Sequence, residues 1–265
     1  MDAEIPVDFV VDGVKVVNAV GPEFNRLWIL TNATLMTHGN DLAVDVKQIL
    51  AGDNAAIDTT PPGAWAAPLT PGKSGGLVYV KAISASGKLK IIAAGQGGGT
   101  GARGGAGGAG GKGAKGSKGE TGREYNDACE RHGCVRTVCA RQPGNGGQGA
   151  QGAQGLPGLG GYPGGNSATV VVDIASPTNF EVVPIINPGA GGAGGIGGAG
   201  GPGGPGGNPG DAPSPCPSAR TGAGGPQGDV GPVGPQGPSG NAQPICLKLG
   251  ASFVGDCKSF ENMTR

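Results

Sequence analysis

Residues 189–210 read GAGGAGGIGGAGGPGGPGGNPG, and this stretch decides what kind of fold the chain can adopt. Glycine occupies every third position from Gly189 to Gly210, and a second glycine column runs from Gly191 to Gly206. A period of three belongs to the polyproline-II helix, whereas an α-helix repeats every 3.6 residues and a strand every 2. The two columns therefore predict a central helix whose neighbours approach closely on several sides.

Glycine recurs at every third position in three further tracts, which are residues 95–122 (tract one), 146–164 (tract two) and 222–240 (tract four), so the quoted stretch is tract three. The second column of tract one holds only small residues. Its third column carries a basic stripe of Arg103, Lys112, Lys115 and Lys118. Prolines share one column of tract four, which predicts a helix at the edge of the group.

The spacing has two structural interpretations. A collagen triple helix needs glycine once per triplet and turns the other two positions outward. Tracts two and four satisfy that rule, but tracts one and three carry a second column of small residues that collagen does not require. A single-chain bundle does require it, because each free N–H must find a carbonyl on a close neighbour. We favour a polyglycine/polyproline-II bundle, with collagen-like trimers and disorder as alternatives.

The composition sets limits on function. Glycine and proline contribute 60 and 23 of the 265 residues, aromatic residues are 4%, and the net charge is zero. Such a chain cannot bury one large core over its whole length, and its zero charge argues against a nucleic-acid partner. No apolar run is long enough to insert in a membrane. The N-terminus lacks a signal-peptide pattern, so we expect either a removed signal or another export route, such as a virus particle.

The fold class predicted from these patterns is mostly β plus the helix bundle, with disulfides. Residues 1–75 are predicted to be a β-rich attachment domain, residues 76–242 the bundle, and residues 243–265 a disulfide-tethered segment. Two β-hairpins are expected to lead into glycine tracts, over residues 77–93 and 169–186, because two alternating runs flank a short turn in each. Candidate strands of the first domain are Val7–Val11, Val14–Val17, Arg26–Leu30 and Ala33–Met36, and residues 58–73 are predicted to be a linker.

Six cysteines predict up to three disulfides, each stabilising the fold by roughly 2–4 kcal/mol. They are Cys129, Cys134, Cys139, Cys216, Cys246 and Cys257. The insert at 123–142 shows helical spacing, and cysteines five residues apart on a helix point about 140° away from each other. The insert cysteines are therefore expected to pair with the later three. A metal site with His132 is the alternative, although the cysteine spacing is unlike that of zinc sites.

Residues 76–242 resemble the polyglycine-II bundles of phage receptor-binding adhesins, such as those at the tips of T-even-like long tail fibres. The Gly-x-x bundle with disulfides is also similar to snow-flea-type antifreeze proteins. Residues 225–240, GPQGDVGPVGPQGPSG, resemble bacterial collagen-like surface proteins. The adhesin resemblance implies that loops between the helices bind the host surface.

No catalytic constellation can be argued, because the chain has two histidines and no Ser-His-Asp or paired-carboxylate pattern. We expect no enzyme activity and no cofactor. The expected function is adhesion on a virion or cell surface, with a larger fibre or particle bound by the N-terminal domain and a host protein or glycan bound by the loops. The candidate receptor contacts are Tyr125, Arg131, Arg136, Tyr162 and Arg220. A trimeric collagen-like coat protein and an ice-binding protein are the alternatives.

Overall fold

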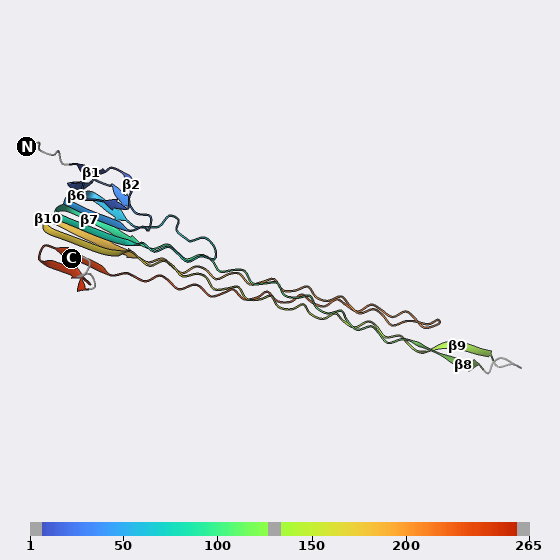
Figure 1. Cartoon of the computed structure of the whole chain (residues 1–265). Helices are drawn as coiled ribbons and strands as arrows, with labels where there is room; N and C mark the ends of the chain where they lie inside the picture. Colours follow the sequence, from blue (N-terminus) through green and yellow to red (C-terminus); the bar gives the residue numbers. More distant parts are fainter. Residues whose placement is uncertain (1–6, 127–133, 259–265) are drawn as a thin grey trace, which may run out of the picture. The chain divides into compact units, whose positions relative to one another are not determined.

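The computed structural model describes residues 7–126 and 134–258 of the chain. These residues form strands and extended segments, with no α-helix among them (Figure 1). The chain divides into two compact units. The first unit comprises residues 1–102, 160–194 and 235–265, and the second comprises residues 103–159 and 195–234. Each tract contributes residues to both units.

The first unit contains a ten-stranded mixed sheet in the order β1-β4-β6-β7-β10-β11-β12, with β2, β3 and β5 beside this path. Every pair is parallel except β11–β12. The sheet includes strands on both sides of residue 75. Its strands are β1 (Asp8–Val11), β2 (Val14–Val16), β3 (Ala19–Val20), β4 (Arg26–Ile29), β5 (Thr34–Met36), β6 (Leu42–Asp58), β7 (Leu77–Ala94), β10 (Thr169–Asn187), β11 (Ile245–Leu249) and β12 (Ser252–Gly255).

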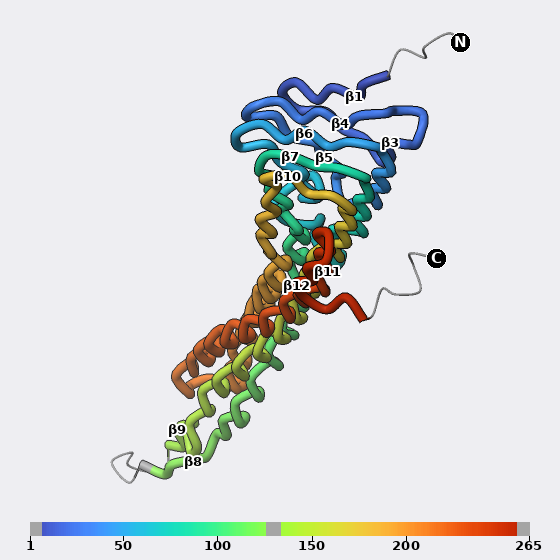
Figure 2. Tube along the Cα trace, turned by 90° about the vertical axis from the view of Figure 1, so that its left-hand side faces the viewer, coloured from blue at the N-terminus to red at the C-terminus, as the bar shows by residue number. Residues whose placement is uncertain are grey.

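The two predicted hairpins are wrong. β7 and β10 are each one long strand, and the two arms of each pair in parallel with a neighbouring strand instead of with each other. Each strand nevertheless reverses its direction along its length: Gly75, just before β7, lies against Ala94 at its end, and Gly189, just after β10, bonds to Gly165 before its start. The bent strands β6, β7 and β10 thus lie one above another as a stack (Figure 2). Alternation predicts which side chains are buried, but it does not say whether the two arms of one strand bond to each other or to the neighbouring strand of this stack.

Residues in the left-handed backbone conformation, with positive φ, lie where the stacked strands bend. Asn32, Asn54 and Asn179 have φ values of 59°, 57° and 49°, and Gly87 has 93°. Asparagine tolerates this conformation better than other residues with a side chain, because its short amide can bond locally. The amide nitrogen of Asn54 donates to Asn32 Oδ1 at 3.1 Å, which joins two successive bends.

The core lies inside this stack and draws on both arms of the long strands. Val78 and Val80 of the first arm of β7, and Leu89 and Ile91 of the second, are fully buried in a single cluster. Because β7 starts and ends at the same place, the chain leaves the stack after Ala94 and returns at β10. Residues 95–168 and 188–244, which contain the four tracts, are thus connections between successive strands of one sheet.

Regular backbone hydrogen bonds join the tracts within each unit. In the first unit, Gly98 N–H donates to Ala190 at 2.8 Å and Gly192 N–H donates to Tyr162 at 2.8 Å. In the second unit the same pattern repeats every three residues: tract one donates to tract three, tract three to tract two, tract four to tract three, and tract two to both tract one and tract four. Tracts two and three therefore each bond to all three others, and tracts one and four bond to two.

The glycine columns lie where the backbones come closest. In tract three, a Cβ added at Gly201 would collide with the carbonyl oxygen of Gly108 in tract one, and a Cβ at Gly200 would collide with that of Gly228 in tract four. Both glycine columns of tract three are therefore required, as the spacing predicts. The small second column of tract one is different, because a Cβ at Gly108 or Gly111 would meet nothing within 4 Å. A single-chain bundle was expected to require this second column of small residues for close packing, and that expectation is wrong for these two positions of tract one.

We expect Gly201→Ala to destabilise the chain and Gly108→Ala to leave it nearly unchanged. The methyl group at residue 201 would meet backbone, which cannot rotate away, so the cost is about 1–3 kcal/mol. At residue 108 the methyl group points into open space, and the change stays within about 0.5 kcal/mol. Urea unfolding of both variants measures the difference, and equal losses of stability would contradict it.

Candidate functional site

The insert between tracts one and two forms a two-stranded antiparallel ladder of β8 (Glu120–Asn126) and β9 (Cys134–Arg141) in the second unit. The helix predicted over residues 123–142 is therefore wrong for the part of this insert that the structure describes, residues 123–126 and 134–142. Tyr125 pairs across the strands with Val135, and Arg123 pairs with Thr137. Aromatic and β-branched residues in such cross-strand pairs stabilise a ladder, and this preference outweighs the helical spacing of the apolar residues.

Large side chains are exposed on this hairpin. Tyr125 is 70% exposed and Val135, its cross-strand partner, is 49% exposed. Arg136 lies opposite Glu124. An exposed aromatic ring beside an aliphatic group and charged neighbours is the composition that recognition surfaces favour. Val135 was not among the sequence-predicted contacts, although its place in the alternating run Val135-Arg136-Thr137 was a usable signal.

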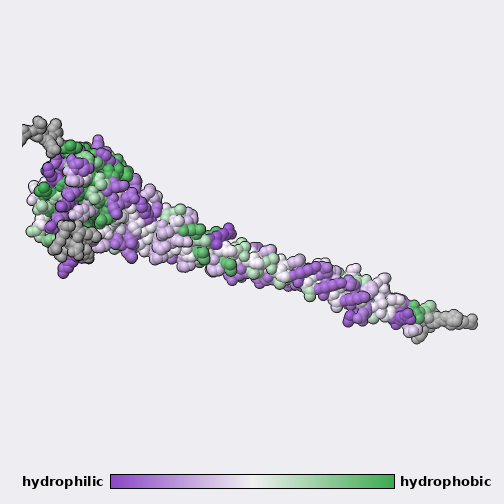
Figure 3. All heavy atoms as spheres, in the orientation of Figure 1, coloured by the Kyte–Doolittle hydropathy of each residue, from purple (hydrophilic) through white to green (hydrophobic). Residues whose placement is uncertain are grey.

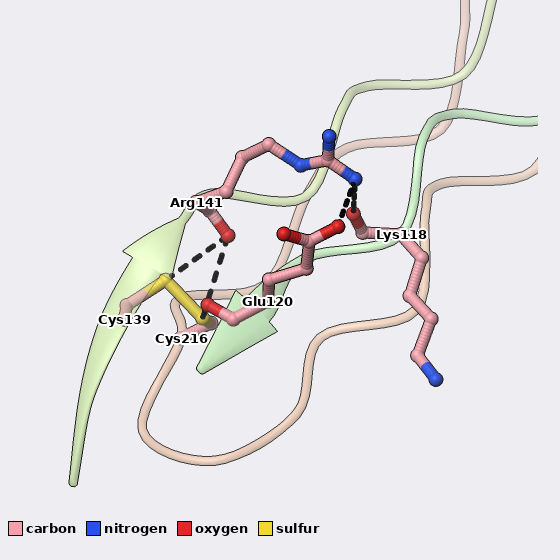
Figure 4. Close-up of polar contacts among 5 residues, drawn as sticks. All are labelled: Lys118, Glu120, Cys139, Arg141 and Cys216. Carbon is pink, nitrogen blue, oxygen red and sulfur yellow. Dashed lines mark hydrogen bonds and ion pairs between the residues drawn. A yellow bond between two sulfur atoms is a disulfide. The ribbon is translucent and has the colours of Figure 1, made fainter. Parts of the chain in front are cut away.

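A disulfide between Cys139 and Cys216 fastens the hairpin to the segment after tract three (Figure 4). The backbone carbonyl of Arg141 lies beside this bond, while its guanidinium forms an ion pair with Glu120 at 2.7 Å and donates a hydrogen bond to the carbonyl of Lys118 at 3.2 Å (Figure 4). Glu120 begins β8 and Arg141 ends β9, so these contacts close the base of the hairpin. The base is thus held by one covalent bond and two polar contacts.

The predicted disulfides are confirmed in part. Cys139 pairs with Cys216 as expected for an insert cysteine and a later one. Cys246 and Cys257, by contrast, pair with each other, although each was expected to pair with an insert cysteine. The antiparallel strands β11 and β12 bring these two cysteines together. Cys134 is also disulfide-bonded. Cys129 lies outside the described residues, as does His132 of the alternative metal site.

Of the four predicted receptor contacts that the structure describes, Tyr125 and Arg136 lie on the two paired strands of the hairpin. Arg220 lies elsewhere in the second unit, where its N–H donates to Asn145 Oδ1 at 2.8 Å. Tyr162 belongs to the first unit, is half-buried, and donates its N–H to Gly99 within the tract ladder. Arg131 lies outside the described residues.

The basic stripe of tract one lies on an exposed column of the second unit, where Figure 3 shows hydrophilic residues along the tracts leading to β8 and β9. Lys115 Nζ forms an ion pair with Asp211 at 2.9 Å. Hydrogen bonding and charge from Lys115, with a smaller contribution from Lys118, lower the pKa of Asp211. No ion pair within the described residues engages Arg103, Lys112 or Lys118. The charge of the stripe is therefore partly neutralised by Asp211, which directly follows tract three.

Residues 7–126 and 134–258 show neither a cluster of metal ligands nor a helix that could cross a membrane. No group of three or more His, Cys, Asp or Glu side chains in this part of the chain is arranged to hold a metal ion. The described residues also contain no helix long and apolar enough to cross a membrane.

We expect loss of the Cys139–Cys216 bond to cost more stability than loss of Cys246–Cys257. The first closes a span of 77 residues and the second a span of 11. In the chain-entropy account these spans correspond to about 4.5 and about 2.8 kcal/mol. Urea unfolding of the double variants Cys139→Ser/Cys216→Ser and Cys246→Ser/Cys257→Ser tests the order, and the reverse order would refute the entropic argument.

The Lys115→Gln variant is expected to raise the pKa of Asp211 toward its ordinary value, because the ammonium group that favours the carboxylate is gone. In the native chain the pKa of Asp211 is lowered, so the ion pair persists at neutral pH and is lost only as the pH falls through that lowered pKa. An NMR titration of the Asp211 carboxyl carbon measures the change. Lys112→Gln is the matched control and should leave the titration unchanged.

No protein-family model, curated protein or solved structure matches this chain. The resemblance to phage adhesins thus stays a prediction.

Proposed function

We propose that this chain is a non-enzymatic receptor-binding protein in which a polyglycine-II bundle carries the β8–β9 hairpin as its contact surface. The observation that carries the proposal is the exposed Tyr125–Val135 pair on a hairpin that a disulfide and an ion pair fasten at its base. Recognition surfaces on rigid supports are common, because an ordered support lowers the entropy lost on binding.

The hydrogen-bond pattern supports a polyglycine-II bundle. N–H groups donate to neighbouring tracts at intervals of three residues, as in Gly104 to Ile196 and Gly107 to Ala199. No tract glycine among the described residues has the positive φ that would break an extended helix. A polyproline-II helix has no internal hydrogen bonds, so donors on its buried sides must bond to neighbours.

The same bonds favour a single-chain bundle over a collagen-like trimer. In the second unit, the regularly spaced glycine donors of all four tracts are already bonded to carbonyls of the same chain. A trimer would have to break these bonds and reform them between chains. A monomeric mass in solution is the expected consequence.

The proposed partners follow from the two parts of the chain. The β-rich part of the first unit would attach to a larger fibre or particle, and the hairpin would bind a host surface protein or glycan. Disulfides persist in oxidising surroundings, which supports a place on a virion surface or outside a cell. Enzyme activity, nucleic-acid binding and membrane insertion form no part of the proposal.

The test uses the full chain, fluorescently labelled, with a panel of intact candidate host cells. Tyr125→Ala/Arg136→Ala should reduce binding at least tenfold on any cell type that the native chain binds, because both changes remove hot-spot residue types from one surface. Arg103→Ala, an exposed arginine on tract one, is the control and should bind normally. The proposal fails if the hairpin variant binds normally, and loss of binding by Arg103→Ala alone would point to the basic stripe.

A further inference from the structure

A small groove lies on the first unit, well separated in sequence from the β8–β9 hairpin. Its volume is about 260 Å³. The lining residues come from three segments and are Trp65, Ala66, Pro68, Gly98, Thr100 and Ala193. None of them carries a charge. The sequence predicted only a linker at residues 58–73, so this groove is a product of the tertiary structure.

The segment that carries Trp65 is bonded along the start of tract one. Gly97 N–H donates to Ala64 at 3.0 Å, and Ala66 N–H donates back to Gly97 at 2.8 Å. Further on, Leu69 N–H donates to Thr100 at 3.0 Å. These bonds place residues 64–70 beside the tract as an additional strand-like segment, so the wall of the groove is ordered.

The Gln96 side chain also bonds to the segment that carries Trp65. Its Nε2 donates to the carbonyl of Pro62 at 2.8 Å and lies 3.3 Å from the carbonyl of Trp65. Its Oε1 accepts from Lys73 N–H at 3.2 Å. The indole lies against Gly97, where a Cβ would collide with the ring. The ring is thus fixed in place while remaining 57% exposed, so its free face is organised before a ligand arrives.

The chemistry of the lining selects among ligands. A saccharide or a charged group needs several polar partners, because each buried polar group left without one costs free energy. Thr100 is the only lining residue with a polar side chain apart from the indole N–H of Trp65. An amphipathic helix, about 10 Å across with its side chains, is too wide for so small a groove. A thin, apolar, extended segment is favoured instead.

Proline-rich segments have these properties. They adopt a preformed polyproline-II helix, so little backbone entropy is lost on binding, and they dock in grooves lined by aromatic side chains. The groove floor also suits an extended partner, because tracts one and three run alongside each other here, with Gly98 N–H bonded to Ala190 and Gly101 N–H bonded to Ala193. A proline-rich segment docked there would lie along these tracts and contact the groove through its rings, because proline has no backbone N–H to donate.

We propose that the Trp65 groove binds a proline-rich polyproline-II segment of a partner protein. This inference does not depend on the proposed role of the hairpin, since the two surfaces share no residue. The first unit would then hold a peptide-binding site, through which it could attach to a proline-rich segment of a larger particle.

The test follows the fluorescence of Trp65 in the full chain. Trp28→Phe removes the other tryptophan, so the emission reports on the groove alone. Decaproline is the probe, and a glycine-serine decamer is the control peptide. Saturable quenching or a blue shift with decaproline, and none with the control, is expected. The absence of a saturable change with decaproline, or an equal change with the control peptide, overturns the proposal.

Variants separate the groove from general effects. Trp65→Ala should weaken the binding of labelled decaproline at least tenfold by fluorescence anisotropy, whereas Trp65→Tyr should retain much of it and Trp28→Ala should bind normally. Thermal unfolding confirms that each variant is folded, and if Trp65→Ala does not fold, the fluorescence titration of the Trp28→Phe chain with decaproline and the control peptide decides.

Two further results would assign the groove to another occupant and overturn the proposal. The first is tighter binding of an N-acetylglucosamine trimer than of decaproline. The second is concentration-dependent self-association, seen by analytical ultracentrifugation without peptide and abolished by Trp65→Ala, which would identify a second copy of the chain as the occupant.

Discussion

A backbone hydrogen bond from every third N–H of one glycine tract to a carbonyl of its neighbour is the interaction on which the tracts depend. An extended segment of this kind bonds nothing within itself, so its buried donors need a partner on another segment. The bond closes only when the two backbones come close, and a Cβ at Gly198 or Gly201 would fill that space. The glycine content of the chain is therefore a packing requirement wherever a column faces another backbone.

The sheet of the first unit holds the ends of the tracts next to each other, so that these bonds can begin there. Each long strand bends back on itself, so one strand ends where the next begins, and the tracts leave and return at neighbouring positions. Gly95 N–H donates to Asn187 at 2.9 Å, and Gly75 N–H donates to Asn166 at 3.1 Å. Two ends held next to each other lower the entropy lost when a long connection folds. The same arrangement holds the residues of the Trp65 groove, which three separate segments supply.

Alternation along the chain predicted about half of the described strands but not their partners. The strands near Val7–Val11 and Arg26–Leu30 were found close to the expected positions, because half-buried strands show a period of two. That period is the same for a hairpin arm and for an arm stacked in parallel, so the pairing of β7 and β10 could not be read from it. The insert was misjudged for a related reason, since Tyr125 and Val135 satisfy a helical spacing as well as a cross-strand pair. The secondary structure of a short segment that fits both periods is decided by its tertiary partners.

By itself, the sequence determined that four tracts of period three exist, which residues share a column, and that cysteines constrain a chain with few core residues. Only the tertiary structure decided which neighbour each column faces. Gly108 and Gly201 both belong to columns of small residues. A Cβ at Gly108 would nevertheless meet nothing within 4 Å, whereas a Cβ at Gly201 would collide with backbone. Trp65, in a predicted linker, became the wall of a groove. The physical reason is that a period describes one segment, whereas contact depends on the order and register in which hydrogen bonds align that segment with others.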